Sequence, residues 1–288
     1  MKTYLDCFPC FLKQGLECAR ISTDDPEIHK KVLNNIMEIL ISIDYTRTPP
    51  NIARRVYREI KKATANSDPY RDIRARDNEQ MLALYNSISS RIFNDDDALY
   101  LACRLAAGIN IIDSGAGKRK EHHTQQDIEA ILDIDPVIDS FQELKNDLQQ
   151  ASILLYIGDN SGEIVMDKLL ITVIKKEFPD LVIYFGVRGE PVINDIIEAD
   201  AIEVGIDEYC EVISNGDSAP GTELAYCSAE FKRIFEKADL IISKGQGNYE
   251  TLSGTENKKI YYMLVAKCPV IARHIGVDVG GMMIKRDG

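Results

Sequence analysis

Polar residues follow several short apolar runs in the second half of the sequence. Asp159 and Asn160 come after the first run, Arg188 after the second, and Lys244 after a later one. Carboxylate and carboxamide oxygens are the ligands that hard divalent cations prefer, so Asp159, Asn160 and Asp195 would suit Mg²⁺ or Mn²⁺. Lys244 and Arg188 could hold phosphate oxygens. These residue types predict metal-assisted chemistry on a phosphate.

Glycines beside these residues fit the same chemistry. Gly162 precedes a helix-length segment, and free N–H groups at a helix start can bind an anion. Gly245 and Gly247 follow Lys244 directly and would let the backbone approach phosphate oxygens closely. They do not complete a dinucleotide fingerprint, because Glu250 stands where the third glycine belongs.

Simpler interpretations exist for single residues. Asp159 and Asn160 could cap the helix that follows them. Asp195 could be a helix-start residue that complements the helix dipole. Neither interpretation explains why residues 214–217, and Arg273 with His274, also follow apolar runs. We therefore expect one shared site built from five strand ends.

The second half alternates between strand-like and helix-like segments. Apolar runs predict buried strands at 153–157, 181–185, 201–204, 240–242 and 270–272. Helix-length segments lie between them at 163–177, 191–199, 222–237 and 258–267. Such an alternation predicts an α/β fold with a parallel sheet covered on both faces. Ligands bind beyond the carboxyl ends of the strands in such sheets, which is where the polar residues lie.

The first half has helical periodicity and no strand alternation. Asn51 is a plausible N-cap for a helix containing Ile52, and Asp135 with Pro136 is expected to open another helix. The change of period near residue 150 predicts two parts. Residues 1–150 form a helical N-terminal region, and residues 151–288 form the α/β domain that carries the metal and phosphate site.

Composition limits the possible partners. The chain has 288 residues with 34 Lys and Arg against 46 Asp and Glu, a net charge of −12 that argues against a nucleic-acid partner. No apolar run approaches the roughly 18–20 residues of a membrane span, and no signal-peptide pattern opens the chain. The seven scattered cysteines are typical of reduced thiols in a cytoplasmic protein. The sequence leaves the oligomeric state open.

A CxxC motif stands near the N-terminus, at Cys7 and Cys10. One CxxC is half a zinc site, and no second pair stands at finger spacing. Thioredoxin chemistry would place the motif after a strand in a βαβ unit. Structural thiols on the first helix are the favoured interpretation, and a metal or redox role remains the alternative.

Taken together, these motifs resemble the damage-control phosphatase family, also called the ARMT-like family and once known as a domain of unknown function. The match is closest to the archaeal branch and spans the chain. Its segments are 6–10, 110–115, 158–163, 188–195 and 244–250. One departure is Ile109, which stands where the family usually has Gly before the Asn of its Asn-x-x-Asp motif. This departure concerns the local turn more than the chemistry.

The resemblance implies a metal-dependent phosphatase of small phosphorylated metabolites, such as sugar phosphates or damaged cofactor precursors. It implies a Rossmann-like α/β/α domain preceded by a helical region. The implied metal ligands are Asp159, Asn160 and Asp195, with Mn²⁺, Co²⁺, Ni²⁺ or Mg²⁺ as the cofactor. The implied phosphate and pocket residues are Asn110, Asp113, Gly162, Glu163, Arg188, Asn194, Lys244, Gly245 and Gly247.

The leading hypothesis is metal-assisted phosphomonoester hydrolysis with Asp159, Lys244 and Arg188 as catalytic residues. We favour water over the Asp159 carboxylate as the nucleophile, because a metal-bound carboxylate is less free to attack. A methyltransferase that uses S-adenosylmethionine is a weaker alternative, since it would want a glycine-rich turn where Asp159 and Asn160 stand. A non-catalytic module that binds a phosphorylated metabolite would use the same residue types.

Overall fold

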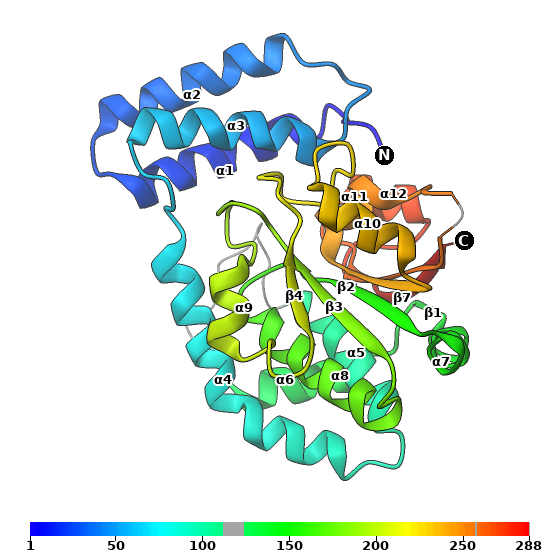
Figure 1. Ribbon diagram of the computed structural model, residues 1–288. Coiled ribbons are helices and arrows are strands. Elements are labelled where there is room, and N and C mark those ends of the chain that lie inside the picture. The colour runs from blue at the N-terminus through cyan, green and yellow to red at the C-terminus, as the bar shows by residue number, and fades with distance from the viewer. Residues whose placement is uncertain (112–123, 257, 288) are drawn as a thin grey trace.

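A seven-stranded, mostly parallel sheet forms the centre of the protein (Figure 1). The structure is a computed structural model that describes residues 1–111, 124–256 and 258–287. The strand order is β1-β7-β6-β5-β2-β3-β4, and within it only the β6–β7 pair is antiparallel. The strands are β1 (Ile138–Asp139), β2 (Ile153–Ile157), β3 (Val182–Val187), β4 (Glu211–Ser214), β5 (Leu240–Lys244), β6 (Ile260–Val265) and β7 (Met282–Asp287).

Helices cover both faces of this sheet. Those on one face are α4 (Arg71–Phe93), α5 (Ala98–Gly108), α6 (Gln125–Leu132), α7 (Phe141–Gln150), α8 (Glu163–Glu177) and α9 (Glu198–Val204), with the short 3₁₀ helix η1 (Ile109–Ile111). Those on the other are α10 (Ala229–Lys237), α11 (Gly245–Leu252) and α12 (Pro269–Ile275). In the part of the chain that the structure describes, none of the helices has the length and apolar character needed to cross a membrane.

Successive strand residues alternate between these two helical layers. Leu154 and Tyr156 of β2 pack in the core that contains α5 and α8, whereas Leu155 and Ile157 pack in the core that contains α10 and α11. Both faces of a central strand are therefore buried, which is why its sequence is a continuous apolar run. The predicted α/β/α arrangement with a preceding helical region is confirmed.

The first three helices form a separate three-helix unit with its own core. These helices are α1 (Cys7–Ser22), α2 (Pro26–Ile41) and α3 (Pro49–Thr64), and Figure 1 shows them as a layer at the top of the view. Their core contains Phe11, Ile36 and Ile60. Buried Arg54 on α3 joins this unit to the rest of the molecule through an ion pair of 2.9 Å with Asp217.

Helices α4–α7 also belong to the region predicted to be helical, but they pack on the sheet. The strand β1 lies in that region too, so the expectation of no strand there is wrong. With two residues, β1 is too short to show a period. Helix α7 begins at Phe141 rather than near Asp135, and α3 begins at Pro49 with Thr48, not Asn51, as its N-cap.

Two predicted elements around residue 200 are wrong. Residues 201–204, predicted as a strand, belong to helix α9, and residues 191–197, predicted as the start of a helix, form the loop before it. Ala201 and Val204 are buried while Ile202 is exposed, which is one face of a helix rather than a strand. The strand that follows β3 in the chain and pairs with it at the edge of the sheet is instead β4. The next helix, α10, starts at Ala229 rather than 222, capped by Ser228.

For residues 258–272 the predicted order of helix and strand is wrong, because the strand comes first and the helix second. Residues 258–267 contain the strand β6, and residues 270–272 lie in the helix α12. All six residues of β6 are buried, and a short run that is buried on every side cannot be told from a buried helix by its period. Pro269 occupies the first turn of α12, where its missing N–H costs nothing. The antiparallel β7 was not predicted.

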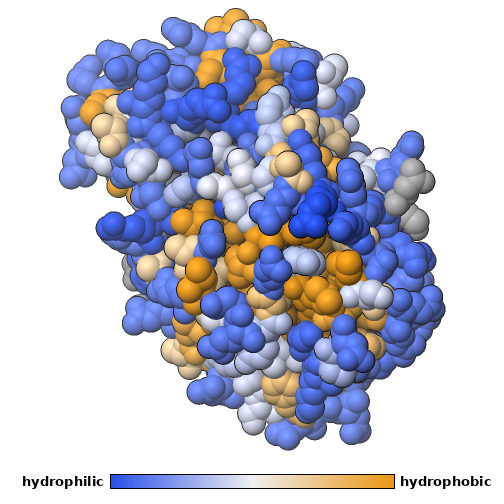
Figure 2. All heavy atoms as spheres, viewed as in Figure 1, coloured by the Kyte–Doolittle hydropathy of each residue, from blue (hydrophilic) through white to orange (hydrophobic). Residues whose placement is uncertain are grey.

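The face of the molecule drawn in Figure 2 has apolar surface over the sheet and hydrophilic surface over the outer helices. Figure 2 shows apolar surface gathered in the middle of the view, over the β3 and β4 strands, where the sheet ends. The three-helix unit and the outer side of α4 are largely hydrophilic in the same view. Among the described residues, the edge strand β4 pairs with β3 alone, and no further strand covers that side.

The Arg54–Asp217 ion pair should contribute strongly to stability. Replacing Arg54 with Ala leaves a buried carboxylate without its cation, so the free energy of unfolding should fall by about 3 kcal/mol in urea titrations. Arg58→Ala, on the exposed side of the same helix, is the control and should change it by less than about 0.5 kcal/mol. Equal effects of the two substitutions would refute this role.

Candidate active site

Two loops lie side by side at the carboxyl ends of β2 and β3. Asn160 and Asp195 form a backbone bridge, Ser161 donates its N–H to the Asn194 carbonyl at 2.9 Å, and Ile196 donates to the Asp159 carbonyl at 3.0 Å. These contacts bring Asp159, Asn160 and Asp195, the three predicted metal ligands, into one place. The side chains of all three are more than nine-tenths buried.

Arg188 lies between the two aspartates. Its Nε donates to Asp195 Oδ2 at 2.7 Å, and its Nη2 lies 3.4 Å from Asp159 Oδ1. Its Nη1 donates to Asn248 Oδ1 at 3.0 Å. The guanidinium is 1% exposed. The predicted phosphate clamp is thus engaged with carboxylates of the protein.

Lys244, the last residue of β5, is fully buried beneath the same loops. Its Nζ donates to Asp167 Oδ1 at 2.5 Å and lies 3.6 Å from Glu163 Oε2. Burial alone would lower the pKa of Lys244, but the Asp167 and Glu163 carboxylates outweigh it and raise the pKa above its usual value. Lys244 is therefore a cation that neutralises buried acids on α8.

Glu163, the first residue of α8, connects the predicted metal ligands to Lys244. Its Oε1 accepts hydrogen bonds from Asn110 Nδ2 at 2.5 Å and from Asn160 Nδ2 at 3.0 Å. The Asn160 Nδ2 also donates to Asp159 Oδ2 at 2.8 Å. Asn110 from η1 is thus part of the site, while the predicted pocket residue Asp113 lies outside the described residues.

Gly245 is required where α11 begins. It has a φ of +75°, and a Cβ placed on it would lie 1.9 Å from Asp159 Oδ2. Any side chain here would displace the Asp159 carboxylate. Gly247 has a different role, since a Cβ there would lie 2.0 Å from the carbonyl oxygen of Pro220.

The expectation of free N–H groups at the start of α8 is wrong for Gly162. Its N–H donates to Asn78 Oδ1 on α4 at 2.8 Å. Ser161 next to it is held on both sides, by Asn194 through its N–H and by Asp77 through its hydroxyl. The loop is therefore tied to the protein at positions where an anion was expected.

Sequence reasoning missed Asp77, Asn78 and Asp167. Asp77 and Asn78 lie on α4, and no local pattern relates them to a loop more than 80 residues away. Asp167 stands one helical turn after Glu163, so the i, i+4 spacing on α8 could have found it. The Tyr156 hydroxyl donates a hydrogen bond to Asp167 Oδ1 at 2.6 Å.

Two of the five predicted strand ends do not join the site. In the segment after β4, Asp217 pairs with Arg54 of the three-helix unit, and Asn215 accepts the N–H groups of Gly189 and Asp217. Arg273 and His274 end a helix rather than a strand. The Arg273 side chain is 66% exposed and faces Asp6 at 3.6 Å.

Six buried ionisable residues form what we call the acidic cluster: Asp159, Glu163, Asp167, Arg188, Asp195 and Lys244. Four are acids and two are bases, so with every group ionised the cluster carries 4 − 2 = 2 negative charges in excess. Burial, and then repulsion from Asp195 and Glu163, raises the pKa of Asp159 well above its usual value, against the attraction of Arg188. The cluster lacks positive charge.

A divalent cation fits this donor set. Asp159, Asn160 and Asp195 offer hard oxygen ligands, and a double positive charge would balance the acidic cluster. Within residues 1–111, 124–256 and 258–287, no three His, Cys, Asp or Glu side chains converge on one metal position. The predicted ligand set has two carboxylates, Asp159 and Asp195, and the Asn160 amide.

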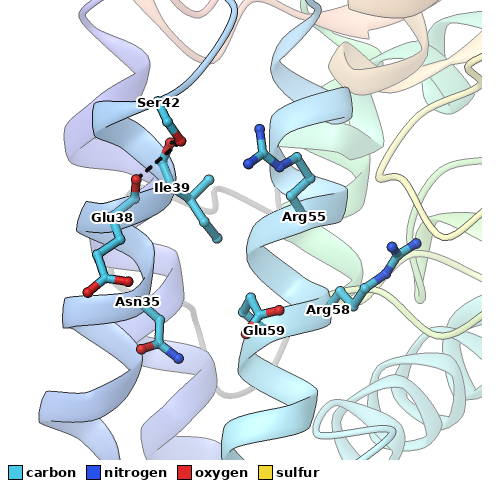
Figure 3. A pocket seen from close by; sticks show the side chains of 7 residues that line it. All are labelled: Asn35, Glu38, Ile39, Ser42, Arg55, Arg58 and Glu59. Atoms are coloured by element: carbon cyan, nitrogen blue, oxygen red, sulfur yellow. Dashed lines mark hydrogen bonds between the residues drawn. The ribbon is translucent and has the colours of Figure 1, made fainter.

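A separate hollow of about 570 Å³ lies between α2 and α3 (Figure 3). Arg55 and Glu59 on α3 and Glu38 on α2 line it, and Figure 3 shows Arg58 pointing away from α2. None of its lining residues belongs to the acidic cluster. Size alone therefore does not identify the functional site.

The sequence model of the damage-control phosphatase ARMT1-like domain matches residues 3–283. This chain belongs to that family. A damage-control phosphatase of Pyrococcus horikoshii is 31% identical over 100% of this chain and 99% of its own length. One of Archaeoglobus fulgidus is 32% identical over 97% of each chain. An uncharacterized protein of Methanocaldococcus jannaschii is 37% identical over 98% of this chain and 94% of its own length.

The crystal structure of a DUF89 family protein from Pyrococcus horikoshii has a TM-score of 0.91 to this chain, covers 100% of both chains and is 30% identical. The fold of this damage-control phosphatase family member is therefore shared along its whole length. The family supports a phosphatase-type function and hydrolase chemistry. The roles of the individual site residues stay predictions.

Gly245→Ala should disturb the site more than its backbone cost explains. A positive φ costs a non-glycine residue about 1–2 kcal/mol, and the Cβ also meets Asp159. Phosphatase turnover should fall by about 100-fold, because the Asp159 carboxylate is displaced. Gly254→Ala is the matched control, since its φ is +81° and nothing lies within 4 Å of its Cβ. A control with the same loss of turnover would contradict the proposed contact.

Glu250 on α11 should make stability depend on pH. Burial raises its pKa from 4.5 to about 7, against the hydrogen bond from Gln246. The folded state therefore binds this proton more tightly, and the free energy of unfolding should fall as pH rises from about 4.5 to 7, by up to about 3 kcal/mol. Urea titrations at pH 5 and 8 should show Glu250→Gln gaining that amount relative to wild type. Exposed Glu236→Gln should gain nothing; a flat Glu250→Gln difference would exclude this effect.

Proposed function

We propose that this protein is a metal-dependent phosphomonoesterase of small phosphorylated metabolites. The observation that supports it most is the acidic cluster at the carboxyl ends of β2, β3 and β5, which would carry two negative charges in excess with every group ionised. Ligands of parallel α/β sheets bind at this edge. The proposed cation is Mn²⁺, Co²⁺, Ni²⁺ or Mg²⁺, and the proposed location is the cytoplasm, where the free cysteines stay reduced.

Asp159, Asn160 and Asp195 would hold the cation. When bound, a divalent cation polarises phosphoryl oxygens and lowers the pKa of a bound water. Arg188 fixes the orientation of both aspartates through its Nε and Nη2. Because its guanidinium is planar and fully buried, the two carboxylates cannot turn independently.

Lys244 and Glu163 would support the metal ligands without binding the cation themselves. Lys244 pairs with Asp167 and lies 3.6 Å from Glu163, and Glu163 in turn orients the Asn160 amide. The two buried cations, Lys244 and Arg188, also supply positive potential where the phosphoryl group gains negative charge. Asn194, which adjoins Asp195 on the same loop, and Asn110 complete the proposed phosphate pocket.

The structure favours water over Asp159 as the nucleophile. Asp159 Oδ1 faces Arg188 and Asp159 Oδ2 accepts from Asn160, so both oxygens are engaged. A carboxylate held at both oxygens has little freedom to move onto a phosphorus atom.

A methyltransferase is not supported, since buried Asp159 and Asn160 stand between Gly158 and Gly162 in the turn after β2, where a nucleoside site would want a glycine-rich turn. A non-catalytic module could use the same ligands. Turnover separates it from an enzyme, because such a module would bind the phosphorylated metabolite and release no inorganic phosphate.

Asp159→Asn should abolish turnover while keeping the shape of the site. The amide removes one negative charge from the metal ligands, so release of phosphate from phenyl phosphate with Mn²⁺ should fall by more than about 100-fold. Wild type freed of metal by a chelator should lose the same activity and regain it with Mn²⁺. Exposed Asp207→Asn is the control.

The thermal unfolding temperature of Asp159→Asn should stay near that of wild type, because the replacement is isosteric. Equal turnover of Asp159→Asn and Asp207→Asn would refute the metal site. Full activity in the chelated protein would refute metal dependence by itself.

A further inference from the structure

A cavity of about 440 Å³ lies between the three-helix unit and α11–α12. We call it the α1–α11 pocket. Its wall includes Cys7 and Cys10 from α1, Ala53 from α3, Gln246 from α11 and Cys268 before α12. The volume lies within the roughly 300–1,000 Å³ typical of small-molecule sites.

Three chain segments connect this pocket to the acidic cluster. Ile193 in the wall is two residues before Asp195, on the same loop. Gln246 follows Gly245, where a Cβ would lie 1.9 Å from Asp159 Oδ2. Cys268 follows Lys267, whose charge acts on the pKa of Asp159. The pocket therefore adjoins the metal ligands at the start of α11.

The wall of the pocket is apolar and carries acids rather than bases. Its remaining residues are mainly prolines and aliphatic or aromatic side chains. Among the residues that the structure describes, the lining contains Asp6 and Glu250 but no Lys, Arg or His. Two neighbouring cations are already engaged with this wall, Arg273 with the Asp6 carboxylate and the Met1 ammonium with the Glu250 carbonyl. A second phosphate or a carboxylate placed here would meet no cation in the lining itself.

The side-chain carbonyl oxygen of Gln246, a residue of the pocket wall, accepts no hydrogen bond from the described residues. Gln246 Nε2 donates to Glu250 Oε1 at 3.2 Å, which orients the amide. Gln246 Oε1 is then buried and accepts no hydrogen bond from the described residues. An unpaired buried acceptor costs about 1–3 kcal/mol, so a ligand hydroxyl that displaces the atoms covering Gln246 Oε1 would gain a favourable hydrogen bond there.

From these observations we infer that the α1–α11 pocket holds the alcohol portion of the phosphomonoester and selects alcohols without a second anionic group. This rests on the proposed phosphatase function and names its substrate class. The phosphoryl group lies at the acidic cluster, the apolar part of the alcohol packs on the prolines, and a hydroxyl donates to Gln246 Oε1. Sugar bisphosphates and phosphorylated carboxylic acids are excluded by charge.

The first experiment compares three aryl phosphates of similar shape with the metal-loaded protein. They are phenyl phosphate, 4-(hydroxymethyl)phenyl phosphate and 4-carboxyphenyl phosphate. The carboxylate should lower kcat/KM by about tenfold or more, because a buried charge without a partner is costly. The hydroxymethyl compound should be at least as good as phenyl phosphate, which separates charge from size.

The second experiment narrows the pocket. Cys10 is exposed at its rim, so Cys10→Trp should fold and obstruct the entrance. KM for phenyl phosphate should rise by about tenfold, while inhibition by inorganic phosphate, which needs only the acidic cluster, stays unchanged. Ser42→Trp, in the separate hollow between α2 and α3, is the matched control.

The outcomes distinguish the two proposals. Hydrolysis of phenyl phosphate with no penalty for the carboxylate, or with an unchanged KM in Cys10→Trp, overturns the pocket assignment and leaves the phosphatase intact. A parallel loss of phosphate inhibition in Cys10→Trp also overturns it, since the substitution then acts on the acidic cluster. If the metal-loaded wild type hydrolyses none of the three esters, both proposals fail.

Discussion

The burial of Arg188 between Asp159 and Asp195 is the interaction on which the site depends. Two carboxylates this deep in a protein repel each other and lose their hydration. The guanidinium pairs with both, and Asn248 holds its third nitrogen, so the site keeps its shape before a ligand arrives. Lys244 likewise pairs with two buried carboxylates, those of Glu163 and Asp167. A preorganised arrangement of this kind avoids the cost of reorganisation when charge develops.

The backbone around this interaction is fitted to it. Gly245 leaves room for the Asp159 carboxylate, and Asn78 holds Gly162 at its positive φ of +75°. The three-helix unit closes one side through Arg54 and Asp217. The unit also forms one wall of the α1–α11 pocket, which lies where the unit meets α11 and α12.

Much of the site was predictable because residues at the ends of parallel strands must meet. β2, β3 and β5 are neighbours, and Asp159, Arg188 and Lys244 follow or end them. The errors have two causes. Residues 201–204 are too few to show a period, since Ala201 and Val204 are buried while Ile202 is exposed. In the segment 258–272 all six residues of β6 are buried, and burial on every side removes the period that distinguishes strand from helix. Consequently Arg273 was placed at a strand end when it lies on the exposed end of α12.

The sequence by itself determined the α/β class, the family, and the residue types that gather at one edge of the sheet. Local spacing carries that information, since it sets which face of a strand or helix a residue occupies. Only the tertiary structure decided that Lys244 and Arg188 are paired with carboxylates, that Asn78 takes the N–H expected for an anion, and that Cys7, Cys10 and Cys268 share one pocket. Lys244 and Asp167 are 77 residues apart in the chain, and Asn78 and Gly162 are 84 apart, so only packing brings them within hydrogen-bond distance.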